Sequence, residues 1–322
     1  MEPFKLVRAG NDAAAIQAGG RFIAGGTNLL DLMKLNIETP KTLVDINKLP
    51  LSKVEQLPNG NIKIGALVKN SDLAYHPLIQ KSYPVLSEAL LSGASPQLRN
   101  MASVGGNLMQ RTRCPYFYNA DQPCNKRIPG SGCGAIDGFN RMNAVLGTSD
   151  KCIATHPSDM CVAMAALGAV IHVQGAKGSR AIAFSDFHLL PGQTPHIEHS
   201  LRPGELITYV EIPALNAAKS HYLKVRDRAS YEFALASAAV VLDIQNGIIK
   251  TARIGLGGVG TKPWRTMEAE QSLVGKPANA TAYQAAAAIA MNGAKAYRDN
   301  AYKIELAKRT LVRALTTVGE MS

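Results

Sequence analysis

The sequence predicts an α+β fold with two domains, on the basis of three observations. The chain has 322 residues, 46% of them hydrophobic, which is enough material for two or three packed cores. Short strand and helix patterns alternate over the first 215 residues, and from residue 216 a run of strands is followed by two helices. We therefore expect one domain over residues 1–215 and a separate C-terminal α+β domain over residues 216–322.

The first domain is expected to contain short elements and one long insertion. Before the insertion, we expect strands at 21–24, 42–46 and 62–66 and helices at 71–75 and 83–91. Residues 110–154 are rich in Gly, Pro, Asn and Asp and show no hydrophobic period, which indicates an ordered insertion with a function. After the insertion, we expect a helix at 157–167, a strand at 169–173, a loop at 189–202 and a strand at 206–212.

The second domain is expected to place long strands before its helices. The strands are expected at 221–225, 235–244 and 250–256, and the helices at 281–297 and 301–318. Residues 254–262 contain a literal GxGxxG, but no βαβ unit follows and no acidic residue lies about twenty positions on. We interpret this segment as a closely packed strand end, not as a nucleotide-binding loop.

The composition is basic, with 35 Lys and Arg against 24 Asp and Glu and a net charge of +11. Nucleic acid is not favoured as a partner, because no helix-turn-helix or zinc-finger spacing is present. The basic residues are expected to offset anionic cofactors or an acidic partner. No apolar stretch is long enough for a membrane span, and residues 1–5 lack the pattern of a signal peptide.

Catalytic motifs built from side chains are sparse in this chain. It contains neither HExxH nor GxSxG. His196 and His199 lie close together but have no acidic or cysteine companions in a recognisable pattern, so we interpret them as solvated surface residues. We therefore expect the chemistry to depend on bound cofactors.

Two glycine pairs predict phosphate-binding turns. The first turn, residues 24–31, follows an apolar strand and opens a helix that Thr27 or Asn28 can cap. The second turn, residues 103–107, repeats the glycine pair. A plain strand-to-helix turn is the alternative for either one alone, but two nests of backbone N–H groups would suit the two phosphates of a dinucleotide.

Four of the five cysteines, Cys114, Cys124, Cys133 and Cys152, lie in the insertion. Disulfides are disfavoured without a signal for an oxidising compartment. Gaps of nine, eight and eighteen residues are irregular for zinc, whereas an iron–sulfur cluster also takes four thiolates. A cluster, a zinc ion and free thiols all remain open from spacing alone. Cys161 lies in an apolar helical run and is interpreted as a core residue.

Taken together, the motifs resemble the FAD-binding subunits of molybdenum hydroxylases, a group that includes xanthine and carbon monoxide dehydrogenases. The resemblance spans essentially the whole chain and rests on residues 24–29, 103–108, 156–159, 201–205 and 257–259. It implies a two-part PCMH-type FAD-binding domain followed by a C-terminal domain like that of carbon monoxide dehydrogenase flavoproteins. The insertion is similar to one that holds a [4Fe–4S] cluster in flavoprotein subunits of periplasmic aldehyde oxidoreductases and 4-hydroxybenzoyl-CoA reductases. The overall run of residues is nearer to the former.

The resemblance also implies roles for individual residues. The FAD pyrophosphate and adjoining groups would contact Ala24, Gly25, Gly26, Thr27, Asn28, Leu29, Leu30, Asp31, Ser103, Val104, Gly105, Gly106 and Asn107. Asp159 matches an acidic position on the ribityl side. Lys224, which by itself would be a solvated strand-edge lysine, matches a lysine near the flavin ring that stabilises charge on the reduced ring. Leu201 or Leu206 would touch the ring, and the four insertion cysteines would bind the cluster.

In the family, substrate is oxidised at a molybdenum centre on a large subunit, and electrons reach this FAD through [2Fe–2S] clusters on a small subunit. The resemblance thus implies an electron-transfer subunit of an aldehyde oxidoreductase, or of a 4-hydroxybenzoyl-CoA reductase-like enzyme. A non-redox scaffold with zinc or bare thiols is the alternative of another class. The external acceptor is left open, and the complex would be periplasmic if a partner carries the export signal and cytoplasmic otherwise.

Overall fold

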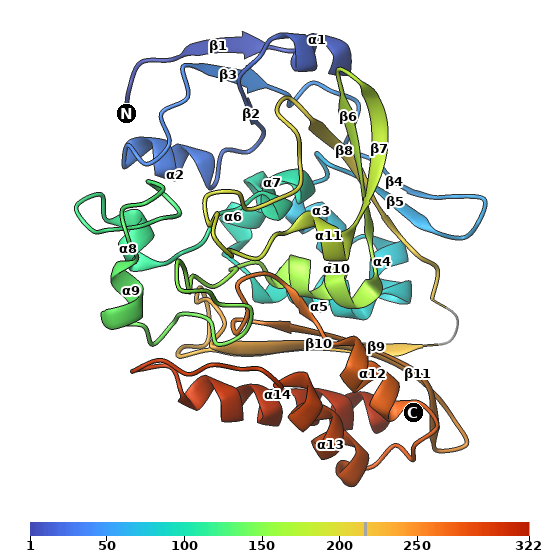
Figure 1. Ribbon diagram of the computed structural model, residues 1–322. Coiled ribbons are helices and arrows are strands. Elements are labelled where there is room, and N and C mark those ends of the chain that lie inside the picture. Colours follow the sequence, from blue (N-terminus) through green and yellow to red (C-terminus); the bar gives the residue numbers. More distant parts are fainter. Residues whose placement is uncertain (216–217, 322) are drawn as a thin grey trace.

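Three β-sheets form the framework of the computed structural model, which describes residues 1–215 and 218–321 (Figure 1). The first is parallel, in the order β1 (Lys5–Arg8), β3 (Thr42–Asp45) and β2 (Arg21–Ile23). The second is antiparallel, in the order β4 (Val54–Gln56), β5 (Ile62–Gly65), β8 (Leu206–Ile212), β6 (Val170–Gly175) and β7 (Gly178–Ala183). The third is also antiparallel, in the order β12 (Trp264–Arg265), β11 (Ile248–Gly257), β10 (Ala236–Gln245) and β9 (Lys219–Val225).

The helices are short in the first part of the chain and longer near its end. The helices before the insertion are α1 (Asp12–Gln17), α2 (Leu29–Lys34), α3 (Asn70–Ala74), α4 (Pro77–Ser82), α5 (Pro84–Ser92), α6 (Pro96–Met101) and α7 (Val104–Leu108). The insertion contains α8 (Pro115–Tyr118) and α9 (Gly134–Asp137). The remaining helices are α10 (Asp159–Leu167), α11 (Phe184–Phe187), α12 (Met267–Leu273), α13 (Ala280–Ala290) and α14 (Tyr302–Gly319). This mixture of helices and sheets confirms the α+β prediction.

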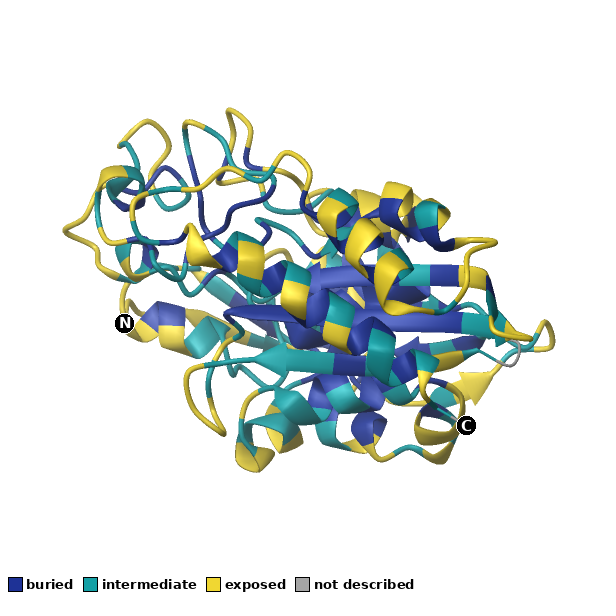
Figure 2. Ribbon diagram, turned by 90° about the horizontal axis from the view of Figure 1, so that it is seen from below, coloured by how far each residue is buried: buried dark blue, intermediate teal, exposed yellow. Residues whose placement is uncertain are grey.

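The third sheet is covered on both faces, so β10, one of its two inner strands, is buried along most of its length (Figure 2). Side chains alternate across β10, because successive residues of a strand point to opposite faces. Ala238 and Val240 belong to the core under α13 and α14, whereas Ala239 and Val241 belong to the core shared with α5 and α10. Every residue of α10 is buried. The third sheet thus packs against α5 and α10 on one face and against α13 and α14 on the other.

The glycine-rich segment at the end of β11 packs as the sequence predicts. A Cβ on Gly255 would lie 2.5 Å from the carbonyl oxygen of Val162 in α10, and one on Gly257 would lie 2.4 Å from the Val162 side chain. Glycine is required because helix and strand approach too closely for a side chain. The interpretation as a closely packed strand end is confirmed.

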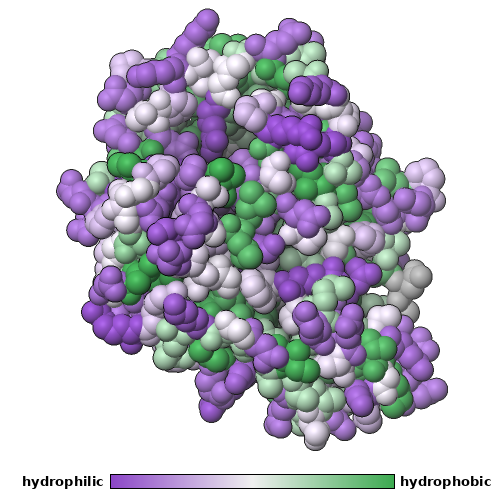
Figure 3. Space-filling model, viewed as in Figure 1, coloured by the Kyte–Doolittle hydropathy of each residue, from purple (hydrophilic) through white to green (hydrophobic). Residues whose placement is uncertain are grey.

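Two expectations about secondary structure need correction. The helix expected over 281–297 ends at Ala290, because Gly293 takes a φ of +76° in the turn that follows. Strands β1, β4 and β7 were not expected from the sequence. Their residues are mostly exposed, so no alternation of apolar side chains marks them. On the face shown in Figure 3, hydrophilic residues are interspersed with smaller groups of hydrophobic ones.

Candidate functional site

Two main cavities are lined by residues that the sequence predicts to bind FAD, and the first glycine turn borders the larger of these two, which has a volume of about 370 Å³. This size is within the usual range for small-molecule sites. Of the residues that the sequence predicts, it is lined by Ala24, Gly25, Gly26, Thr27, Asn28, Leu29, Ser103, Gly105, Gly106, Leu201 and Leu206. The fold therefore brings both glycine turns and the segment before β8 to one cavity.

The two glycines of the first turn are required for different reasons. A Cβ on Gly25 would lie 1.9 Å from the carbonyl oxygen of Met101, at the end of α6. Gly26 has a φ of +71°, in the left-handed region that favours glycine. Gly25 thus allows the turn to pack against α6, and Gly26 allows the chain to enter α2.

The backbone N–H groups of residues 25–29 are free to bind a ligand. Within residues 1–215 and 218–321, none of them donates a hydrogen bond to a protein acceptor. Asn28 does not cap α2 with its side chain; its Oδ1 accepts from the Arg111 N–H at 2.9 Å, and its buried Nδ2 has no protein partner. A cluster of unpaired N–H donors beside a cavity fits an anionic group such as a pyrophosphate.

The second glycine turn is different, because its N–H groups are already used. Those of residues 104–107 donate to the carbonyl oxygens of Val68, Ala66 and Ser103 and to the Ser103 hydroxyl, at 2.8–3.2 Å. The expectation of a second open nest is therefore wrong. Ala66 and Val68 accept from two of these donors and Ser103 accepts from the other two, so residues 104–107 contribute to the cavity wall and offer no free N–H groups.

Five of the residues predicted to bind FAD line neither main cavity: Leu30, Asp31, Val104, Asn107 and Lys224. Asp31 is exposed on α2 and Val104 is fully buried in the core. Asn107 connects the second turn to the next segment, because its Oδ1 accepts from the Ser158 hydroxyl at 2.6 Å.

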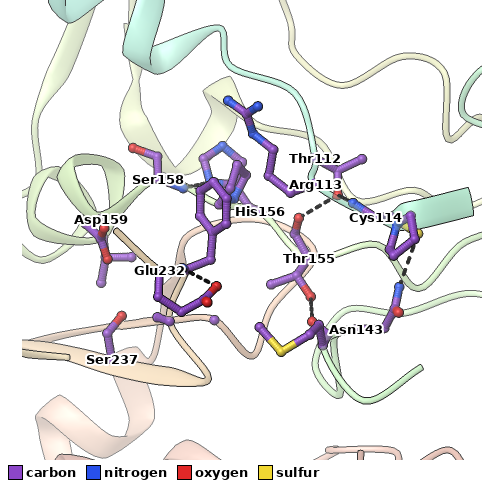
Figure 4. Close-up of a pocket in the computed structure, with 17 residues that line it drawn as sticks. Thr112, Arg113, Cys114, Asn143, Thr155, His156, Ser158, Asp159, Glu232 and Ser237 are labelled. Atoms are coloured by element: carbon purple, nitrogen blue, oxygen red, sulfur yellow. Dashed lines mark hydrogen bonds between the residues drawn. The ribbon is translucent and has the colours of Figure 1, made fainter. Parts of the chain in front are cut away.

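The smaller cavity, of about 180 Å³, lies between α10 and the cysteine insertion (Figure 4). Ser158 and Asp159 line one side of it, and Cys114 and Asn143 line the other. A third cavity of about 30 Å³ shares His156 with the smaller cavity and His199 with the larger one. The three cavities therefore adjoin one another from the first glycine turn to Cys114.

Asp159 and Lys224 form a buried ion pair. The Lys224 Nζ lies 2.8 Å from Asp159 Oδ2, and the two side chains are 3% and 8% exposed. Lys224 also donates to the Ser92 carbonyl oxygen at 3.1 Å, and the Tyr222 hydroxyl donates to Asp159 at 2.6 Å. Burial and the nearby carboxylate raise the pKa of Tyr222 well above its usual value. Lys224 is therefore not a solvated strand-edge lysine.

The prediction that both loop histidines are solvated is wrong for His199. His196 is exposed, but His199 lines the larger cavity, and its Nδ1 is buried without a protein partner. Burial lowers the pKa of His199, so the ring is neutral near pH 7. The sequence could not show this, because the loop at 189–202 folds back over the first turn.

A further histidine pair lies between the cavities. The rings of His156 and His188 meet edge to face at 4.5 Å, and burial lowers the pKa of both, that of His188 to about 4. The Cys161 sulfur and one nitrogen of each of these two histidine rings lie within 4.8 Å of one another. The Ser158 N–H donates to His156 Nδ1, however, so the Nε2 of the neutral ring keeps its proton. The trio therefore does not suit a metal ion, and Cys161 is a fully buried core residue as predicted.

The four insertion thiols gather in one place. Burial, and to a smaller degree Cys124, raises the pKa of Cys114. Burial raises the pKa of Cys152 to about 12, with smaller contributions from Cys133 and Cys114 that act in the same direction. The backbones of Cys124 and Cys133 form an isolated antiparallel β-bridge. Such buried thiols stay protonated unless a metal replaces the proton.

The spacing between these sulfurs is wider than a single zinc ion requires. Four sulfurs bound at zinc's usual bond length would lie about 3.8 Å apart at the corners of a tetrahedron. In the described part of the chain, no three of the four thiol sulfurs lie within 4.8 Å of one another. The four thiols as placed therefore do not form the tetrahedral ligand set of one zinc ion.

Arg111 lies in the insertion and lines the larger cavity, so it connects the two. Its guanidinium contacts Glu38 at 2.8 Å and Glu198 at 2.9 Å, and it donates to the Lys126 carbonyl oxygen at 3.2 Å. The Lys126 ammonium also pairs with Glu198, at 2.7 Å. The sequence could not identify the carboxylate partners of these two basic residues, because Glu38 and Glu198 lie more than 70 residues from them.

Two family models match this chain. The model of the FAD binding domain in molybdopterin dehydrogenase matches residues 5–215, and that of the CO dehydrogenase flavoprotein C-terminal domain matches residues 221–318. The chain is 51% identical to the aldehyde oxidoreductase FAD-binding subunit PaoB of Escherichia coli, over 98% of each chain. It is 30% identical to the glyceraldehyde dehydrogenase medium chain of Sulfolobus acidocaldarius, over 80% of this chain and 75% of that one.

Solved structures support the same relationship. The fold matches a chain of reconstituted CO dehydrogenase from Oligotropha carboxidovorans with a TM-score of 0.78 and 26% identity, over 100% of both chains. It matches a chain of the enzyme from Hydrogenophaga pseudoflava with a TM-score of 0.77 and 25% identity, over 98% and 97% of the two chains. Among the described residues, no helix is long and apolar enough to cross a membrane.

Proposed function

Because this chain belongs to the family of FAD-binding proteins of molybdopterin dehydrogenases, we propose that it is the FAD- and [4Fe–4S]-containing electron-transfer subunit of a molybdenum-dependent aldehyde oxidoreductase. In this proposal, a large partner subunit oxidises the aldehyde, and a small partner with [2Fe–2S] clusters delivers the electrons. This chain passes them to an external acceptor. The observation that supports this most directly is the row of cavities that leads from the open glycine turn to Cys114.

The first turn and the larger cavity fit FAD. The free N–H groups of residues 25–29 and the unpartnered Asn28 Nδ2 would donate to the pyrophosphate. Ser158 and Asp159, at the smaller cavity, would bind the ribityl side, and Leu201 would contact the ring. Bound FAD supplies a carrier that accepts two electrons and releases them singly or together.

The four insertion thiols would bind the cluster, which supplies a one-electron carrier. Cys114 lines the same cavity as Asp159, so the cluster ligands border the FAD side of the molecule. The wide spacing of the sulfurs favours the cluster over the zinc scaffold. The compartment of the chain would follow that of a signal-bearing partner.

Metal and flavin analysis of the complex co-purified with its partner subunits tests this proposal. We expect one flavin per chain, about four irons beyond those of the partner clusters, and visible absorbance that dithionite bleaches. Flavin with zinc, or with no additional metal, would reduce the insertion to a structural loop. Absence of flavin would overturn the assignment.

Single Cys→Ser variants then separate the roles of the thiols. We expect Cys114→Ser and Cys152→Ser to lose the additional iron and to slow reduction of the external acceptor while FAD is retained. Cys161→Ala is the matched control, because this fully buried thiol lies outside the insertion and should leave the iron content unchanged. Full turnover in a cluster-free variant would contradict a relay role.

A further inference from the structure

The C-terminal domain holds the cysteine insertion through a dense set of hydrogen bonds. Asn140 and Asp299 exchange two hydrogen bonds, at 2.9 and 3.2 Å. The Asn300 side chain donates to the carbonyl oxygens of Asn143 and Ala144 at 3.3 and 3.2 Å. Asn140 and Asn300 are fully buried. Asp299 and Asn300, in the segment just before α14, therefore hold residues 140–144 in place.

Lys303, in the first turn of α14, is an unusual member of this contact. It is fully buried, and its Nζ donates to the carbonyl oxygens of Met142 and Asn143 at 3.0 and 3.2 Å. Within residues 1–215 and 218–321, no carboxylate forms an ion pair with it. Burial lowers its pKa to about 7. A buried ammonium with only neutral acceptors is costly, and a nearby anion would remove much of that cost.

Asn143 connects Lys303 to the thiols. The same residue that accepts from Lys303 through its carbonyl oxygen donates from its side-chain Nδ2 to Cys114 Sγ at 3.6 Å (Figure 4). Asn143 is 3% exposed, so this contact is shielded from water. Two hydrogen-bonded steps thus lead from the buried ammonium to a sulfur of the insertion.

We propose that Lys303, acting through Asn143, is a positioning residue that raises the reduction potential of the cluster bound by the insertion cysteines. This inference rests on the cluster of the proposed function. Reduction adds one negative charge to the cluster. A buried ammonium and an N–H donor to a ligand sulfur both stabilise the more negative state, so they favour reduction.

The test compares Lys303→Met, Asn143→Ala and Lys308→Met in the complete complex. Lys308 is the matched control, because it lies on the same helix, is partly exposed and forms no side-chain hydrogen bond in the described part of the chain. The readouts are iron content and the midpoint potential from a redox titration followed by electron paramagnetic resonance. The [2Fe–2S] clusters of the partner subunit serve as an internal reference.

We expect Lys303→Met and Asn143→Ala to keep their iron and flavin and to show a lower midpoint potential for this cluster alone. Lys308→Met should match the parent complex. An unchanged potential in Lys303→Met would overturn the inference, and an unchanged potential in Asn143→Ala would overturn the route through Asn143. If the parent complex lacks the additional iron, the proposed function fails instead, and the two failures are thereby distinguished.

Lys303→Met is expected to fold, because both acceptors keep another donor. The Met142 carbonyl oxygen also accepts from the Thr155 hydroxyl at 2.8 Å, and that of Asn143 accepts from Asn300. If this variant nevertheless fails to accumulate, Lys303→Gln replaces it, since its amide keeps an N–H donor for the two carbonyl oxygens and removes the charge. A lowered potential supports the inference, and an unchanged potential overturns it.

Discussion

Replacing Lys224 with Met is expected to destabilise this protein far more than the loss of an ordinary lysine. The substitution leaves the Asp159 carboxylate 8% exposed with a single side-chain donor, the Tyr222 hydroxyl. Breaking a buried ion pair by removing one partner costs about 3–5 kcal/mol, because the remaining charge is desolvated and unpaired. That loss corresponds to a factor of about 10²–10³ or more in the unfolding equilibrium constant.

Urea unfolding of the purified chain, followed by circular dichroism, measures this loss. Lys63→Met is the matched control: Lys63 pairs with Glu55 at 3.3 Å, and the two side chains are 37% and 44% exposed. An exposed pair of this kind contributes about 0–1 kcal/mol. The double variant Asp159→Asn with Lys224→Met should recover most of the loss, because it leaves no unpaired charge.

The reasoning would be refuted if Lys224→Met cost no more than Lys63→Met, or if the double variant were as unstable as the single one. Either result would mean that the Asp159 carboxylate finds water or another donor once the ammonium is gone. Lys224 would then act mainly on the flavin, as the family resemblance alone suggested, and not on the packing of β9 against α10.

Two further predictions concern the cavities. Gly25→Ala should lower the amount of bound flavin by about tenfold or more, because its Cβ would overlap the Met101 carbonyl oxygen and displace the turn. Gly10→Ala is the control, because nothing lies within 4 Å of its Cβ. Equal flavin content in the two variants would contradict the prediction. Burial lowers the pKa of His188 from 6.5 to about 4. As the pH falls from 6.5 to 4, the unfolded chain therefore binds a proton at this residue before the folded chain does. The free energy of unfolding should decrease over this range by up to about 1.4 kcal/mol per pH unit. Urea unfolding from pH 4 to 7 should show a shallower dependence in His188→Gln, and an unchanged slope would contradict the assignment.

Local features of the molecule were predictable because they depend on residues close together in sequence. The helix at α10 and the strand at β8 follow from apolar patterns, and Gly26 occupies the left-handed position that its turn requires. The insertion is recognisable because four thiols coincide with a stretch that lacks a hydrophobic period. The end of α13 was missed because its alanine-rich pattern continues past the turn at Gly293.

Long-range contacts account for what the sequence could not show. The N–H groups of the second glycine turn look as open as those of the first, but those of residues 104–107 donate to Ala66, Val68 and Ser103. His199 looks like a surface residue until its loop folds over the first cavity. The number of residues between the cysteines does not determine how far apart their sulfur atoms lie.

By itself, the sequence determined the α+β class, the two glycine turns and the thiol-rich insertion, since each depends on backbone preferences and residue types within a short segment. Only the tertiary structure decided which turn keeps free N–H donors, which charges are paired, and which residue faces Cys114. Lys303 lies 160 residues from Asn143, yet the two are in hydrogen-bond contact. Such contacts arise from the packing of α14 against the insertion, and packing depends on the whole chain at once.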